Sequence, residues 1–228
     1  MSFEYSFLVL SLLFLLPGTA IVLLRADLRP LLGMTAVLSL PFAATEFLFY
    51  PTYWQPKTLF NLVERVGFGI EDVLFVVGLG LITSGIYPTV FGKRVLRQTS
   101  ESFGRIALRA ALLLAATAVA VVAAVLFDVH MIYAAPVIML VAAAFIVVRR
   151  VDLFVPSLLG GVLTVAVYTG LSLVFELLIP GVFAMDWNTE AFLNRYVLGV
   201  PVEELLYGFA AGLVGSVVGM YLLRARFV

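Results

Sequence analysis

The sequence predicts an all-α, polytopic membrane protein with seven transmembrane helices. Of its 228 residues, 63% are hydrophobic and only 12% are charged, and the mean hydropathy is +1.14. A water-soluble domain does not need that much apolar surface. Seven apolar runs are long enough to cross a bilayer, which takes about 20 residues each. These runs cover residues 5–24, 31–50, 68–91, 106–127, 131–148, 154–180 and 197–223.

The basic residues predict how these spans are oriented. In a seven-span arrangement only Lys57, Arg65 and Arg195 fall on one side, and the other 11 of the 14 Lys and Arg residues fall on the opposite side. Positive loops stay in the cytoplasm, so we expect the N-terminus outside the cell membrane and the C-terminus inside. The first apolar run has no basic stretch before it and no small-residue cleavage site, so we interpret it as a span and not as a signal peptide. The 11 residues are Arg25, Arg29, Lys93, Arg94, Arg97, Arg105, Arg109, Arg149, Arg150, Arg224 and Arg226.

Similar landmarks occur in the same order in the two halves of the chain. The segment 67–75 resembles 199–207 at a constant offset of 132, and 25–33 resembles 150–160. A glutamate also precedes a tryptophan in each half, Glu46 before Trp54 and Glu176 before Trp187. The alternative explanation is chance similarity among apolar segments.

Duplication is the interpretation we favour, because three landmarks keep their order. The matching spans lie four spans apart, an even number, so the two repeats are expected to be parallel. We predict a first three-helix repeat over residues 1–92, a linker with the fourth helix over 93–129, and a second repeat over 130–228, all in one membrane domain.

Six carboxylates lie within the spans or at their outer ends. Ionisable groups at membrane depth are costly and usually functional. Two neighbouring carboxyl groups do not both ionise cheaply, so a cluster holds a proton donor beside a proton acceptor. The alternative role is hydrogen bonding that holds helices together. The six are Glu46, Glu71, Asp72, Glu176, Glu203 and Glu204, and of these we expect Glu71 and Glu203 to face one shared cavity.

Other residue types exclude several classes of protein. The chain has no cysteine and one histidine, His130, which excludes thiolate chemistry and metal sites built on several histidines. There is no Gly-rich dinucleotide fingerprint after a strand, so we expect neither a metal nor a cofactor. A net charge of zero gives no sign of a nucleic-acid partner. Tyr53, Trp54 and Trp187 are interpreted as interface anchors, and Asp27 and Asp152 as partners of the arginines beside them.

The two acidic motifs resemble those of the integral-membrane lycopene cyclase family. They read Gly-Phe-Gly-Ile-Glu-Asp at 67–72 and Gly-Val-Pro-Val-Glu-Glu at 199–204, and the spacing of Glu46 and Trp54 adds to the likeness. That family occurs as two small subunits or as one fused chain, with a Pro-x-Glu-Glu or Pro-x-Glu-Asp motif in each unit. The resemblance covers nearly the whole chain, although Gly69 replaces the motif proline in the first half.

This resemblance implies an enzyme that closes β-type rings on the ends of lycopene or a related linear carotene. The reaction is a redox-neutral, intramolecular lyase or isomerase step, and it needs a general acid, a general base and a dry pocket that stabilises a cation. The implied partners are the linear carotenoid, membrane lipid and other carotenoid enzymes. A carotenoid hydratase, another polyene-modifying enzyme, and a transporter or binding protein with intramembrane carboxylates remain open alternatives.

The resemblance also suggests which residues carry the chemistry. We expect Glu203 and Glu204 to transfer protons, with Glu71, Asp72 and Glu46 as their partners. Pro201 is expected just inside the start of the last helix, where proline fits without loss of a hydrogen bond. The residues expected to bind substrate are Glu176, Tyr207, Phe75, Phe68, Tyr50 and Pro201.

Overall fold

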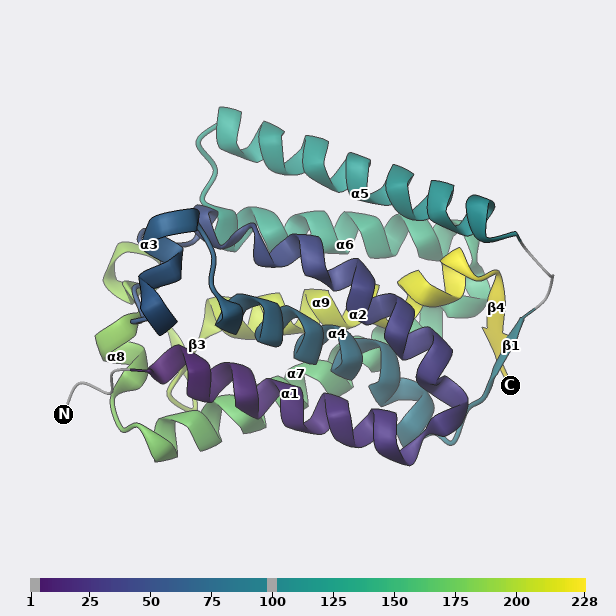
Figure 1. Ribbon diagram of the computed structural model, residues 1–228, viewed down its shortest axis with the longest axis horizontal. Coiled ribbons are helices and arrows are strands. Elements are labelled where there is room, and N and C mark those ends of the chain that lie inside the picture. Colours follow the sequence, from purple (N-terminus) through teal and green to yellow (C-terminus); the bar gives the residue numbers. More distant parts are fainter. Residues whose placement is uncertain (1–4, 98–101) are drawn as a thin grey trace.

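The computed structural model describes residues 5–97 and 102–228, which form a helical bundle (Figure 1). Its long helices are α1 (Ser6–Leu24), α2 (Arg29–Ala43), α4 (Ile70–Val90), α5 (Phe103–Leu126), α6 (Met131–Arg149), α7 (Phe154–Leu178) and α9 (Val202–Leu222). Short helices are α3 (Leu62–Val66), α8 (Val182–Asp186) and the 3-10 turns η1 (Ala26–Leu28), η2 (Glu46–Leu48), η3 (Leu59–Asn61), η4 (Val151–Leu153) and η5 (Thr189–Ala191). The strands are β1 (Val95–Arg97), β2 (Tyr196–Val197), β3 (Val200–Pro201) and β4 (Ala225–Phe227); β1 pairs with β4 and β2 with β3, both antiparallel.

Six of the described helices are long and apolar enough to cross a membrane. The predicted span 31–50 differs, because α2 has only 15 residues and is therefore about 22 Å long. The hydroxyl of Thr45 donates 2.7 Å to the carbonyl of Phe42, and the chain continues through a turn into η2. This change of helical geometry carries Glu46 into the protein, where its side chain is buried.

Two helix hairpins are closed in the same way. Arg25 donates two 2.9 Å hydrogen bonds to Asp27 and a third, of 2.5 Å, to the carbonyl of Lys93 beyond α4. Arg150 donates to Asp152 at 2.8 and 2.7 Å and also reaches a carbonyl in β4. Hydrogen bonding to Arg25 lowers the pKa of Asp27. The expected local ion pairs are therefore confirmed, and each one ties a hairpin to the end of the helix that follows it.

Small residues let the helices of each half approach closely. A Cβ at Gly80 of α4 would lie 2.3 Å from the hydroxyl of Ser39 on α2, and a Cβ at Gly212 of α9 would lie 2.6 Å from the Cβ of Thr164 on α7. Gly80 and Gly212 are 132 residues apart, the same offset that relates the acidic motifs. The pairs α2–α4 and α7–α9 therefore use corresponding glycines.

Three contacts between the halves join residues that are 132 or 133 positions apart. The first is an antiparallel bridge at the end of the bundle where α4 and α9 begin, which we call the acidic end. The second lies where α4 crosses α9, and the third is in the β1–β4 ribbon at the opposite end, which we call the basic end. In that order, the contacts are between Trp54 and Trp187, between Thr83 and Gly215, and between Val95 and Phe227.

Helix α5 lies along one flank of the bundle, with α6 between it and most of the other helices (Figure 1). None of its residues is buried. It packs against α6 and touches α9, where Arg109 donates 3.1 Å to the carbonyl of Leu222. α5 is thus the least enclosed of the long helices described.

Candidate active site

A cavity of about 70 Å³ lies inside the acidic end of the bundle. Three of the six predicted carboxylates line it, one each from η2, α4 and α9. These are Glu46, Asp72 and Glu204, which are 8%, 3% and 9% exposed. The rest of the lining is largely aromatic and comes from both halves of the chain: Phe7, Phe49, Tyr53, Trp54, Phe75, Tyr168, Trp187 and Tyr207.

Two side chains hold the carboxylate of Glu204. The hydroxyl of Tyr168 on α7 donates to one of its oxygens, and the indole N–H of Trp187 donates 2.9 Å to the other. Both donors are buried. Hydrogen bonds donated to a carboxylate favour its charged form, whereas burial disfavours it, so these two donors offset part of the cost of a charge on Glu204.

The other two carboxyl groups of the cavity, Asp72 and Glu46, form a pair. Asp72 accepts a 2.6 Å hydrogen bond from the backbone N–H of Gly69, which caps the start of α4. Glu46 and Asp72 interact with each other. One oxygen of Glu46, Oε1, is buried and has no hydrogen-bond partner among the described residues. Two carboxyl groups this close share a proton more readily than both ionise.

In each acidic motif, the glutamate just before the cavity residue points away from the cavity. Glu71 accepts a 2.5 Å hydrogen bond from the N–H of Leu59, and Glu203 accepts one of 2.9 Å from the N–H of Leu193. The expectation that Glu71 and Glu203 face one shared cavity is therefore wrong. Adjacent helical residues point about 100° apart, so when Asp72 faces the cavity its neighbour faces the preceding loop.

Several expected substrate-binding residues also lie elsewhere. Glu176 accepts a 2.7 Å hydrogen bond from the N–H of Gly181 and closes the turn after α7. The hydroxyl of Tyr50 donates 3.2 Å to Glu64, and Phe68 is 36% exposed. None of the three lines the cavity. Tyr207 and Phe75 do line it, as a substrate-binding role requires.

Pro201 lies one residue earlier than expected. Helix α9 begins at Val202, and Pro201 is its N-cap, with φ −56° and ψ 137°. It belongs to strand β3 and pairs with Tyr196 of β2. Its fixed φ therefore sets the extended approach to α9 and not the first helical turn.

Sequence reasoning missed seven aromatic members of the site, which are Phe7, Phe42, Phe49, Tyr53, Trp54, Tyr168 and Trp187. Tyr53, Trp54 and Trp187 are not interface anchors, since they are only 3%, 9% and 6% exposed and line the cavity. The matched positions of the two tryptophans in the halves were the signal that could have found them. Tyr168 had no such signal, because the corresponding position in the first half, 125 residues earlier, is Ala43.

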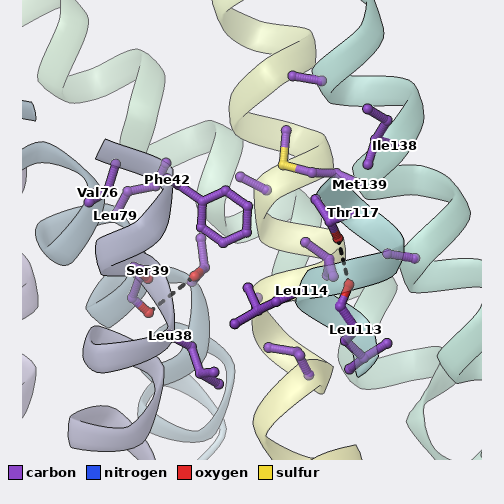
Figure 2. A pocket seen from close by; sticks show the side chains of 18 of the residues that line it. Leu38, Ser39, Phe42, Val76, Leu79, Leu113, Leu114, Thr117, Ile138 and Met139 are labelled. Atoms are coloured by element: carbon purple, nitrogen blue, oxygen red, sulfur yellow. Dashed lines mark hydrogen bonds between the residues drawn. The ribbon is translucent and has the colours of Figure 1, made fainter. Parts of the chain in front are cut away.

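An apolar groove of about 220 Å³ continues from the cavity toward the basic end (Figure 2). Helices α2 and α4 form one wall, α5 and α6 form the other, and α9 forms the floor. Along α9 the lining runs from Tyr207 to Leu222, which is about 22 Å of helix. The groove and the cavity share Phe42, Thr45, Phe49, Val76 and Tyr207.

Three of the hydroxyl groups in the groove are bound to their own helices. Thr35 donates 3.0 Å to Leu31, Ser39 donates 2.9 Å to Thr35, and Thr117 donates 3.0 Å to Leu113, in each case to the carbonyl one turn earlier. They therefore present little polarity to a ligand. A long, narrow, apolar molecule fits the groove best, with one end among the carboxyl groups.

Comparison with known proteins gives a family match. The family model described as lycopene cyclase matches residues 130–222. The matched stretch extends from the start of α6 to the end of α9, so it contains Tyr168, Trp187 and Glu204. No curated protein and no solved structure matches the chain.

Proposed function

We propose that the chain closes β-type rings on lycopene or a related linear carotene, because residues 130–222 match the family model described as lycopene cyclase. The observation that carries this proposal is the apolar groove that ends at three buried carboxyl groups. A linear hydrocarbon lying in the groove places one end in the cavity. The carboxyl groups lie at one end of the groove only, so one end of the carotene reaches them in each binding event.

The Glu46–Asp72 pair is the proposed general acid. Glu46 delivers a proton to the terminal double bond of the carotene, and a carbocation forms at the more substituted carbon. Asp72, held by the N–H of Gly69, is the ionised member of the pair, and its repulsion keeps the proton on Glu46 until the double bond accepts it. The new carbocation then offsets the negative charge left on Glu46. The buried Oε1 of Glu46 supports this assignment, since no described residue meets it in ordinary hydrogen-bond geometry.

Ring closure and proton loss follow at the same place. The neighbouring double bond attacks the cation, a carbon–carbon bond forms, and the positive charge moves into the new ring. Glu204 then takes the proton from the adjacent carbon, which leaves the ring double bond and makes the reaction redox-neutral. The faces of Trp54, Trp187, Tyr207 and Phe75 around the cavity favour the cation before that step.

The arrangement we propose has seven spans, with α2 and η2 together as the second, and two parallel three-helix repeats joined by α5. The matched arginine hairpins and the corresponding glycines of α4 and α9 support the duplication. Three contacts pair a residue with its own counterpart, at both ends and in the middle of the bundle. A pseudo-two-fold axis along the bundle brings together counterpart residues that lie close to it, as in these three contacts.

The function is tested by expressing the chain in a host that accumulates lycopene and separating the pigments by chromatography. We expect cyclic carotenes from the wild type. Glu204→Gln and Glu46→Gln should each lower conversion by about 10²–10⁴-fold, the usual loss for a general acid or base, with normal amounts of folded protein in the membrane.

The matched control is Glu203→Gln. It changes the neighbouring residue in the same way, but an amide oxygen can still accept the hydrogen bond from Leu193. This variant should keep most of its conversion. Pigments unchanged by the wild type would contradict the proposed function, and near-normal conversion by Glu204→Gln would show that the chemistry lies elsewhere.

A further inference from the structure

We propose that the substrate enters the groove sideways from the bilayer, through a portal between α2 and α5, with α5 as the wall that moves. The inference rests on the proposed function for the identity of the occupant, a linear carotene dissolved in lipid. Its structural basis is the continuity between the groove and the carboxyl-lined cavity, together with the way the described residues cover the two ends of the bundle.

The acidic end is covered by a bridge between the halves. Trp54 pairs with Trp187, the N–H of Gln55 donates 2.7 Å to the carbonyl of Asp186, and the N–H of Asn188 donates 2.8 Å to the carbonyl of Tyr53. Ring contacts strengthen it, with the two indole centroids 5.0 Å apart. A hydrocarbon chain that entered lengthwise from this end would have to break backbone hydrogen bonds.

The basic end is covered by the β1–β4 ribbon. The residues that flank it, Arg94 and Val228, exchange two 3.0 Å backbone hydrogen bonds. Arg109 of α5 also donates to the carbonyl of Leu222, the last groove residue of α9. This end carries most of the positive charge of the chain, which makes it a poor entrance for an uncharged hydrocarbon.

The side of the groove is built differently. α2 packs against α4 and α9, whereas α5 packs against α6 and α9. The α5 residues that line the groove are Ala110, Leu113, Leu114, Thr117 and Val121, a single stripe at helical spacing, and none of them is buried. Opposite them on α2 lie Leu38, Ser39 and Phe42 (Figure 2).

A lateral portal matches the physical chemistry of the substrate. Moving a long hydrocarbon through water costs roughly 25 cal/mol for each Å² of apolar surface exposed, and entry from lipid avoids that cost. A helix with few buried contacts also separates from its neighbours more easily than a core helix. Among the described long helices α5 meets this condition best.

The test uses the natural absence of cysteine from the chain. The variant Leu38→Cys/Leu114→Cys is joined across the portal with reducible bifunctional methanethiosulfonates of graded length. Uptake of lycopene from lipid vesicles by the purified protein is followed through the absorption of the bound pigment, and conversion is measured separately. A second pair, Ala116→Cys/Val141→Cys, joins exposed residues of α5 and α6 that do not line the groove, so its cross-link holds α5 without adding bulk to the groove.

We expect the shortest cross-link across the portal to slow pigment uptake by about tenfold or more, as a closed lid does, and reduction to restore it. Protein loaded before cross-linking should retain its pigment when mixed with empty vesicles. The α5–α6 cross-link should also slow uptake and be reversed by reduction, because it holds the wall that moves; unchanged uptake in that variant would show that α5 is not the moving wall. Uptake that is equally fast with and without the portal cross-link would overturn the inference. Uptake that is blocked as expected, in a protein that never converts lycopene, would keep the portal and overturn the proposed function.

Discussion

At the scale of single residues, the two halves hold corresponding carboxylates in different surroundings. Asp72 and Glu204 are 132 positions apart, yet Glu204 receives two side-chain donors, while Asp72 receives a backbone N–H and lies beside Glu46. The difference arises because Tyr168 has Ala43 as its counterpart. In the reaction proposed above, Glu204 is therefore the base and Asp72 is part of the proton-sharing acid.

Removing the hydroxyl of Tyr168 should leave Glu204 in place but make its carboxylate form less stable, so that it is less often ready to accept a proton. We expect Tyr168→Phe to lower kcat by about tenfold or more, because a hydrogen bond to a charged group contributes roughly 1.5–3 kcal/mol. KM should change little, since the hydroxyl binds Glu204. Steady-state conversion of lycopene by the purified protein measures both constants. Tyr221→Phe, which changes a tyrosine of α9 outside the cavity, serves as the control, and an unaltered kcat in folded Tyr168→Phe would contradict the role.

At the scale of helices, the packing of α7 on α9 sets the geometry of the base. α7 carries Tyr168 and α9 carries Glu204, and the two helices meet through residues without bulk. A Cβ at Gly160 would lie 1.8 Å from the hydroxyl of Ser216 and 3.3 Å from the carbonyl of Gly212. The close approach of α9 to α7 therefore depends on the missing side chain of Gly160.

Adding a side-chain carbon at Gly160 should destabilise the bundle. Gly160→Ala is expected to lower the free energy of unfolding by about 1–3 kcal/mol, the usual effect of overpacking, and to reduce conversion because it displaces Glu204 from Tyr168. Gly170→Ala lies on the same helix, where an added Cβ meets nothing within 4 Å, and should be neutral or slightly stabilising. Thermal unfolding in detergent distinguishes them, and equal midpoints for the two variants would show that this contact is not tight.

At the scale of the whole molecule, charge and chemistry lie at opposite ends of the bundle. The β1–β4 pairing brings residues 95–97 and 225–227 together at the basic end, as the predicted orientation requires of its cytoplasmic face. The cavity with Glu46, Asp72 and Glu204 lies at the other end. The proton-transfer site is therefore expected near the outer leaflet, and the groove extends from it toward the cytoplasmic side.

The proposed orientation can be measured with reporter fusions. Reporters joined after Arg97 and after Arg226 should both give cytoplasmic signals, because positive loops are retained inside. A reporter inserted after Lys57, in the connection before α4, should give an external signal. A cytoplasmic signal at Lys57, or an external one at either arginine, would rule out this orientation.

The sequence by itself determined the features that depend on many residues of a segment together, such as its mean hydropathy. Hydropathy marked the apolar helices to within a few residues, apart from the shortened α2. The constant offset of 132 related the acidic motifs of α4 and α9. The second motif lies inside the stretch that matches the lycopene cyclase family. Such properties survive small errors in helix boundaries.

Only the tertiary structure decided which side chains meet. The rotation of a helix about its axis selects Glu204 over Glu203, because a single residue turns the side chain by about 100°. The turn after α2 brings Glu46 to Asp72. Tyr168 has neither a motif nor a counterpart in the other half, and its hydroxyl reaches Glu204 only because α7 packs closely on α9. These directions depend on packing between segments far apart in the chain, which local pattern does not encode.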